Sequence, residues 1–102
     1  MTSIQTKEEL LNVLLQYKDT LKSYGVNKIG LFGSFVKESQ NAESDIDLLV
    51  EFLPDKKNFR NFINLAFFLE DMLNRKVELV TAESLSPYLK PYILKEVEYV
   101  LS

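Results

Sequence analysis

LFGS at residues 31–34 and, ten residues later, DIDLLV at residues 45–50 are the part of this sequence that decides the fold. The first motif ends a predicted strand over 26–32, because its Gly-Ser pair follows a run of β-forming residues. The second opens a predicted strand over 45–52, which a Pro-Asp turn ends. Between the two strands, residues 35–44 are predicted to form a polar connection with one helical turn at its start.

Apolar spacing predicts the other elements, outward from these two strands. The first helix is expected to end at Gly25, a residue that tolerates the backbone of a helix C-terminus. The expected elements are a helix over about 7–24, a helix over 58–73, a strand over 76–81 and a helical segment from Glu83 onward that Pro87 and Pro91 interrupt. Because helical and strand patterns alternate, we predict an α/β (α+β) protein with one domain over residues 1–102.

The helix over 58–73 is apolar on more than one face. One stripe holds Phe59, Phe62, Ile63, Ala66, Leu69 and Leu73, and a second holds Leu65, Phe68 and Met72. One buried face needs an arc of only about 100°. Two interpretations follow: the helix packs between the sheet and the C-terminal helix, or the second stripe docks on a partner protein. The C-terminal segment is expected to help close the core.

The composition excludes several classes of site. The chain has 12 basic and 15 acidic residues, a net charge of −3, and neither His nor Cys. Ser-His-Asp and Cys-His triads, zinc sites with the usual ligands and disulfides are therefore excluded. No apolar run approaches the roughly 20 residues of a membrane span, and the N-terminus lacks a signal-peptide pattern, so we predict a cytoplasmic protein without a membrane partner. The charge also argues against an extended nucleic-acid surface.

Two carboxylates lie side by side in the second motif. Residues two apart on a strand point to the same face, so Asp45 and Asp47 are expected to project together, about 7 Å apart at Cα. Ile46, Leu48 and Val50 then face the core. Adjacent carboxylates repel one another unless a cation lies between them. Such oxygen ligands suit Mg²⁺, and a two-metal site stabilises the attacking and leaving oxygens of phosphoryl transfer.

The Gly-Ser pair supplies groups that bind phosphate. A strand that ends in Gly33-Ser34 before a helical turn presents backbone N–H groups where phosphate is favoured. Ser34 adds a hydroxyl, and Lys37 adds a positive charge within reach. Either motif alone is more often structural, as a turn or as a solvated carboxylate pair. Together, at this spacing and on two strands, they predict a pocket for a metal-bound nucleotide.

Gly33-Ser34, ten residues and then Asp45-x-Asp47 resemble the signature of the minimal nucleotidyltransferases in the DNA polymerase β superfamily. The resemblance covers essentially the whole chain, because the order of helices and strands is similar as well. It implies the small nucleotidyltransferase fold, a three-stranded mixed sheet with helices packed on it. It also implies ATP as the substrate and Mg²⁺, as two ions, as the cofactor.

The resemblance also assigns roles to individual residues. It implies that Asp45, Asp47 and, on the next strand, Glu78 are the catalytic and metal-binding carboxylates, and that Gly33, Ser34 and Lys37 bind the nucleotide. The family usually has aspartate at the position of Glu78, and the structural alternative is an ordinary surface glutamate on an edge strand. Many relatives continue the Gly-Ser pair with a small residue, an arginine and a glycine. This chain has Val36-Lys37-Glu38 at these positions. Lysine lacks the bidentate fork of arginine and Glu38 adds a negative charge beside the phosphate site, so lower nucleotidyltransferase activity is expected.

The short chain leaves no extra domain to hold an acceptor, so the acceptor hydroxyl is expected on another macromolecule. Small nucleotidyltransferases of this kind are similar to the antitoxins of two-gene modules whose toxin is a HEPN-domain ribonuclease. The resemblance implies transfer of AMP from ATP to a tyrosine of that toxin. The chain is not itself such a toxin, because that activity depends on a histidine. Self-association into a homo-oligomer stays open.

Other functions compatible with the sequence are kept as alternatives. The chain could neutralise its partner by occlusion alone, with a weak nucleotide site. It could instead transfer a nucleotide to a small hydroxylated molecule such as an aminoglycoside. An RNA acceptor is disfavoured by the net charge of −3 and by the presence of only two arginines. Charges elsewhere, among them Arg75, Glu96 and Glu98, are predicted to lie on solvated faces.

Overall fold

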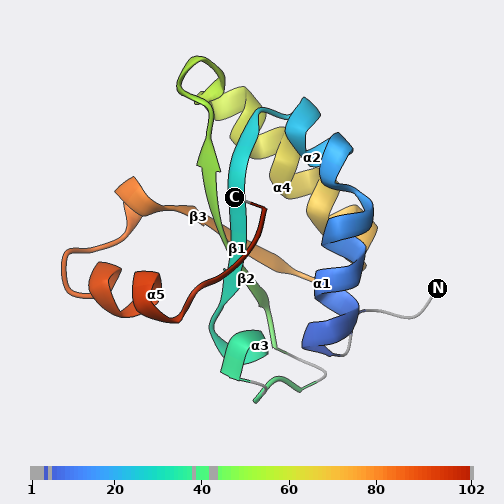
Figure 1. Cartoon of the computed structure of the whole chain (residues 1–102), viewed down its shortest axis with the longest axis vertical. Helices are drawn as coiled ribbons and strands as arrows, with labels where there is room; N and C mark the ends of the chain where they lie inside the picture. The colour runs from blue at the N-terminus through green and yellow to red at the C-terminus, as the bar shows by residue number, and fades with distance from the viewer. Residues whose placement is uncertain (1–3, 5, 38, 42–43, 102) are drawn as a thin grey trace.

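The computed structural model describes residues 4, 6–37, 39–41 and 44–101 and arranges them around one mixed sheet (Figure 1). The strands are β1 (Val26–Phe32), β2 (Ile46–Phe52), β3 (Val77–Thr81) and β4 (Glu98–Leu101). They lie in the order β3-β2-β1-β4, with β2 parallel to β3 and β1 antiparallel to both β2 and β4. The α+β class and the mixed sheet are confirmed, and the sheet has four strands where three were predicted.

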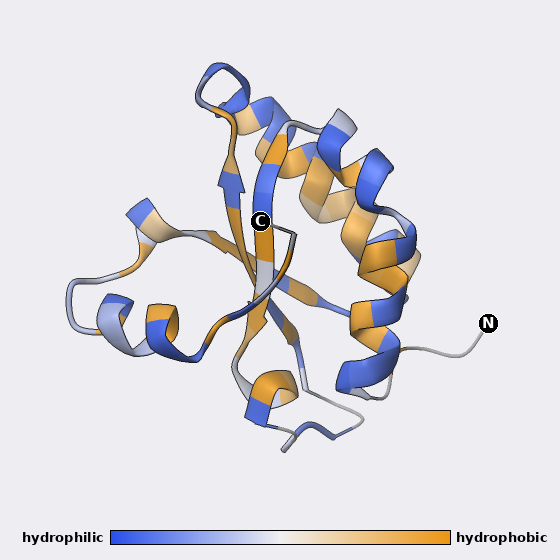
Figure 2. Cartoon of the chain, viewed as in Figure 1, coloured by the Kyte–Doolittle hydropathy of each residue, from blue (hydrophilic) through white to orange (hydrophobic). Residues whose placement is uncertain are grey.

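Helices complete the architecture. They are α1 (Lys7–Gln16), α2 (Lys18–Ser23), α3 (Ser34–Lys37), α4 (Phe59–Leu73) and α5 (Lys90–Glu96), with short 3₁₀ turns at Pro54–Lys56 and Ala82–Ser84. In Figure 1, α1, α2 and α4 lie together, and α5 lies apart from them. Figure 2 shows hydrophilic and hydrophobic residues alternating along these three helices, as in amphipathic helices. Within the described ranges, every helix is too short or too polar to cross a bilayer.

The core lies between the sheet and the layer formed by α1, α2 and α4. Its fully buried side chains include Leu10, Leu14, Leu21, Ile29, Leu31, Leu65 and Leu69. On β2, Ile46, Leu48 and Val50 are buried as predicted. Since successive side chains of a strand point to opposite faces, Asp47 lies on the face of the sheet that is turned away from this core.

The predicted helix over 7–24 is divided into two at Tyr17. Tyr17 has φ −103° and ψ 22°, outside the helical region, and it ends α1 and precedes α2. Its ring packs edge-on against Phe68 of α4, with ring centroids 6.1 Å apart. Thr6 caps α1 by accepting a hydrogen bond from the Glu9 N–H, and Gly25 follows α2 with φ +88°, as predicted for the end of this segment.

Helix α4 packs against the sheet and against the N-terminal helices, not against α5. Phe68 contacts Tyr17 and Tyr24, and Leu65 is fully buried. The second stripe of this helix therefore packs against the core, and docking of a partner on it stays a prediction. The exposed apolar side chains of α4 are Phe59, at 78% exposure, and Phe67, at 66%.

The C-terminal segment differs most from the prediction. The helix is limited to α5, which has no buried residue, so it does not close the core. The chain then forms β4, which pairs with β1. Tyr99 and Val100 favour a strand, but a run this short is also compatible with a helical pattern. Pro91 lies in the first turn of α5, where it is tolerated as predicted.

Close approach of β4 to β1 requires a residue without a side chain at position 30. A Cβ on Gly30 would lie 2.8 Å from the backbone oxygen of Glu98 and 2.8 Å from Cγ2 of Val97. We therefore expect Gly30→Ala to lower the free energy of unfolding by about 1–3 kcal/mol, because β4 must shift. Urea unfolding monitored by circular dichroism measures this, with Asn27→Ala at an exposed position of β1 as the control. Equal midpoints for Gly30→Ala and wild type would contradict the packing of β4.

Candidate active site

Three carboxylates lie at the same end of the sheet. Asp45 directly precedes β2, Asp47 is its second residue, and Glu78 is the second residue of β3. Because β2 and β3 are parallel, their register pairs Asp47 with Glu78. The antiparallel register with β1 pairs Asp47 with Phe32, at the end of that strand. The predicted carboxylates therefore come from neighbouring strands, next to the turn that follows β1.

The surroundings of Asp47 disfavour its charged form. Partial burial raises the pKa of Asp47 to about 6, with further contributions from the negative charges of Glu78, Asp45 and Glu96, in that order. A carboxylate surrounded by other carboxylates is destabilised unless a cation is bound nearby. The arrangement thus suits a cation.

The donor set fits Mg²⁺ in its chemistry. Carboxylate oxygens of Asp45 and Asp47 are hard ligands, and Mg²⁺ usually takes one or two of them together with water and substrate phosphates. Within the described part of the chain, no group of three carboxylates is close enough to hold a metal ion by itself. Glu78, which is exposed, therefore stays a predicted ligand.

The Gly-Ser turn lies directly against Asp47. Gly33 has φ +75°, a conformation that side chains disfavour, and a Cβ there would overlap the Asp47 carboxylate. The next residue, Ser34, begins α3, which the buried ring of Phe35 anchors to the core. Lys37 lies in the only turn of this short helix, and its side chain is largely exposed. The structure thus brings the two sequence motifs into contact, while Glu38 lies outside the described residues.

Glu96, the last residue of α5, also reaches this site. Its Oε1 accepts a hydrogen bond of 3.1 Å from the Gly33 N–H, and its Oε2 lies 3.5 Å from Lys37 Nζ. The prediction that Glu96 lies on a solvated face is wrong. Prediction of a strand at the C-terminus would have indicated the position of Glu96. In that strand Glu98 pairs with Leu31, and continuing the antiparallel register by two residues places Glu96 opposite Gly33. Glu98 itself forms an ion pair of 2.8 Å with Lys7.

Arg75 fixes the segment that leads into Asp45. Its Nε donates to the Ser44 carbonyl oxygen at 2.7 Å, Nη1 donates to the Ile4 carbonyl oxygen at 2.6 Å, and Nη2 donates to the Asn41 carbonyl oxygen. Its guanidinium also lies over the ring of Phe35, 5.0 Å from the centroid. Arg75 was predicted to be a solvated surface charge, and this prediction is wrong.

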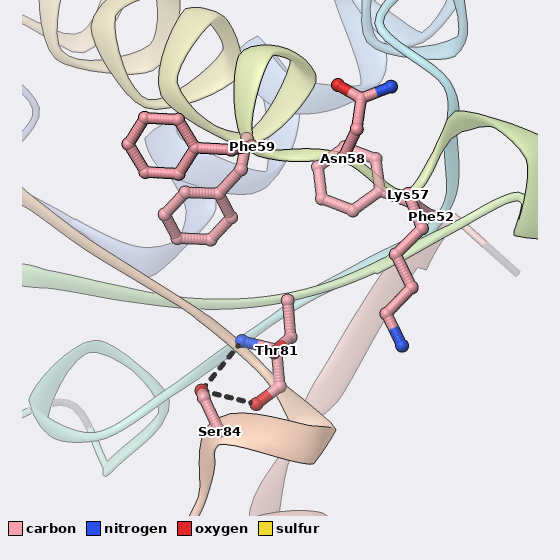
Figure 3. A pocket seen from close by; sticks show the side chains of 7 residues that line it. Phe52, Lys57, Asn58, Phe59, Thr81 and Ser84 are labelled. Atoms are coloured by element: carbon pink, nitrogen blue, oxygen red, sulfur yellow. Dashed lines mark hydrogen bonds between the residues drawn. The ribbon is translucent and has the colours of Figure 1, made fainter.

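A separate pocket of about 370 Å³ lies at the opposite end of β2 (Figure 3). It is lined by Phe52, Lys57, Asn58, Phe59, Phe62, Thr81 and Ser84. Among them, the Ser84 hydroxyl donates to the Thr81 carbonyl oxygen at 2.8 Å. Phe52 pairs with Val26, at the start of β1, whereas Asp47 pairs with its last residue. This pocket is therefore distinct from the carboxylate site.

The raised pKa of Asp47 predicts a pH-dependent stability of the metal-free protein. The folded chain holds the proton of Asp47 more tightly than the unfolded chain does. Protonated Asp47 therefore stabilises the fold below about pH 4, and this stabilisation is lost as the pH rises through about 6. Asp47→Asn removes the charge and should raise the free energy of unfolding at pH 7 by about 1 kcal/mol, a value reduced for solvent screening. Urea unfolding in a metal chelator at pH 4 and pH 7 measures this. Asp71→Asn on the exposed side of α4 is the control, and a destabilised Asp47→Asn at pH 7 would contradict the prediction.

The three carbonyl contacts of Arg75 predict that lysine does not replace it. Lysine lacks the planar fork that reaches several acceptors at once, so Arg75→Lys should lower the free energy of unfolding by about 1–2 kcal/mol. The reverse exchange at the adjacent exposed residue, Lys76→Arg, is the matched control and should stay within about 0.5 kcal/mol of wild type. Thermal unfolding of both variants tests this. Equal midpoints for Arg75→Lys and wild type would show that the three carbonyl contacts of Arg75 do not stabilise the fold.

Comparison with known proteins places this geometry in a family. The model of the family "Polymerase beta, Nucleotidyltransferase" matches residues 16–102. The protein adenylyltransferase MntA of Thermococcus cleftensis is 38% identical over 96 residues, which cover 93% of this chain and 96% of that protein.

Solved structures show the same fold. A minimal nucleotidyltransferase structure superposes with a TM-score of 0.82 at 26% identity, over 95% of this chain and 98% of the other. A chain from the complex of the tri-AMPylated Shewanella oneidensis HEPN toxin with its MNT antitoxin superposes with a TM-score of 0.64 at 22% identity, over 90% of this chain and 72% of the other. The Gly-Ser turn against Asp47, the family model and the MntA relative agree: the chain belongs to the polymerase β nucleotidyltransferase family.

Proposed function

We propose that this chain transfers AMP from ATP to a tyrosine hydroxyl of a HEPN-domain partner and acts as the antitoxin of that partner. The observation that carries the proposal is the contact between the Gly33 turn and the Asp47 carboxylate. It puts a phosphate-binding backbone beside a cation-binding carboxylate, as a metal-bound nucleotide requires. The MntA relative is a protein adenylyltransferase, and the chain of the HEPN–MNT complex shares the fold.

Each residue of the site has a role in the proposed reaction. Asp45 and Asp47 would hold Mg²⁺, which when bound neutralises phosphate charge and lowers the pKa of an attacking hydroxyl. The N–H of Gly33, the hydroxyl of Ser34 and the ammonium of Lys37 would position the phosphates. Glu78, exposed beside Asp47, would accept the proton of the acceptor hydroxyl.

The proposed reaction is a displacement at the α-phosphorus of ATP. The acceptor oxygen forms a bond to the α-phosphorus as the bond from that phosphorus to its bridging oxygen breaks. Pyrophosphate leaves, AMP stays on the acceptor as a phosphodiester, and the proton of the hydroxyl passes to Glu78. Alignment of acceptor and nucleotide supplies much of the rate, so the partner must present its hydroxyl opposite the leaving group.

A second function is favoured by one observation. The Glu96 carboxylate bonds the Gly33 N–H and lies beside Lys37, so two of the groups proposed to bind phosphate already have an acidic partner. A chain with a weak nucleotide site would neutralise its partner by occlusion. In that case complex formation alone, without modification, would suppress the toxin.

Label transfer from ATP that carries its tracer on the α-phosphate separates the two functions. In a reaction with Mg²⁺ and the product of the neighbouring gene as the acceptor, we expect label on that protein. The double substitution Asp45→Asn, Asp47→Asn should lower transfer by about 100-fold or more, because both proposed cation ligands are lost. Asp55→Asn and Asp71→Asn, made together, are the matched control and should retain transfer. A tight complex without any transfer, formed equally by the double variant, would contradict the enzyme and support occlusion.

A further inference from the structure

Glu96 occupies groups that an anion would otherwise bind. One of its carboxylate oxygens accepts the Gly33 N–H, and the other lies 3.5 Å from Lys37 Nζ. A carboxylate resembles a phosphate in charge and in its acceptor oxygens, so both ligands favour the same donors. The Glu96 carboxylate therefore contacts Gly33 and Lys37 as a bound anion would.

The position of Glu96 follows from the sheet and not from a flexible tail. Gly30 pairs with Tyr99 and Leu31 pairs with Glu98, so the residue two before Glu98 arrives beside the turn at Gly33. Close approach is enforced at Gly30, where a Cβ would contact β4. Pairing of the final strand thus delivers the carboxylate to the site.

Release of this carboxylate needs little rearrangement. Helix α5 contributes no buried residue, and Tyr88, Leu89 and Tyr92 on its segment are 86%, 56% and 74% exposed. The Glu96 side chain is 26% exposed, and that of Lys37 is 65% exposed, so water can take the place of each lost contact. Rotation of the Glu96 side chain away from Gly33 would free the Gly33 N–H.

We propose that Glu96 is an internal substitute for a nucleotide phosphate: it holds the Gly33 amide and Lys37 in place, and the incoming nucleotide must displace it. This deepens the proposed function and rests on it, because the same donors are assigned there to ATP. Glu96 is then a residue that sets nucleotide affinity and lowers it. Its departure also takes one negative charge away from Asp47, whose pKa it helps to raise.

Calorimetric titration with Mg²⁺ and α,β-methylene-ATP, an analogue that cannot transfer AMP, tests the proposal. Glu96→Gln removes the charge but keeps an acceptor for the Gly33 N–H, and Glu96→Ala removes both. We expect affinity to rise in that order, by about threefold for the first and about tenfold for the second. Glu98→Gln and Glu98→Ala are the matched controls, because Glu98 is paired with Lys7, and they should stay within about twofold of wild type.

The titrations distinguish failure of the Glu96 displacement from failure of the nucleotide site itself. Tighter binding by both Glu96 variants supports the inference. If wild type binds the analogue and both Glu96 variants bind it with equal or lower affinity, the inference is overturned and the proposed nucleotide site is retained. Absence of binding in wild type and in all variants overturns the proposed enzyme function and the inference with it. Thermal unfolding of each variant verifies that it is folded, and Glu96→Gln, the nearly isosteric exchange, tests the charge even if Glu96→Ala is unstable.

Discussion

The contact between the Gly33 turn and the Asp47 carboxylate is the constraint on which the rest of the site depends. The pairing of Phe32 with Asp47 brings the end of β1 to the start of β2, so any side chain at position 33 would enter the space of the carboxylate. The φ of +75° adds a second requirement for glycine. The antiparallel pairing explains why two motifs separated by a polar connection lie together.

Strand β2 carries opposite properties on its two faces. Ile46, Leu48 and Val50 are buried against the helices, and each such side chain contributes about 1.5–3 kcal/mol by leaving water. The other face holds Asp47, whose charge is disfavoured by partial burial and by its acidic neighbours. The apolar face stabilises the strand strongly enough to keep a repulsive carboxylate cluster in place. The candidate cation site thus lies on a strand whose opposite face is buried in the core.

The sequence predicted the elements whose signals are local. The bounds of β1 and the extent of α4 follow from residue type and spacing, and the Gly-Ser pair and the Asp-x-Asp motif are each a pattern over adjacent residues. The division at Tyr17 and the final strand were missed, because both depend on packing against distant segments. Glu96 and Arg75 were missed for the same reason. Each bonds backbone groups that lie far away in the chain, and backbone groups leave no mark in an amino-acid pattern.

The contacts of Arg75 have a consequence for the order of folding. They join residues separated by 71, 34 and 31 positions along the chain. Closing loops of this length costs conformational entropy before any bond forms, so such contacts belong to the late part of the folding reaction. The core can consolidate around β1, β2 and α4 first, and the guanidinium then fastens the connection that precedes Asp45. The end of the sheet that carries Asp45 and Asp47 would accordingly be the last region to acquire its native arrangement, and the first to open when the chain fluctuates.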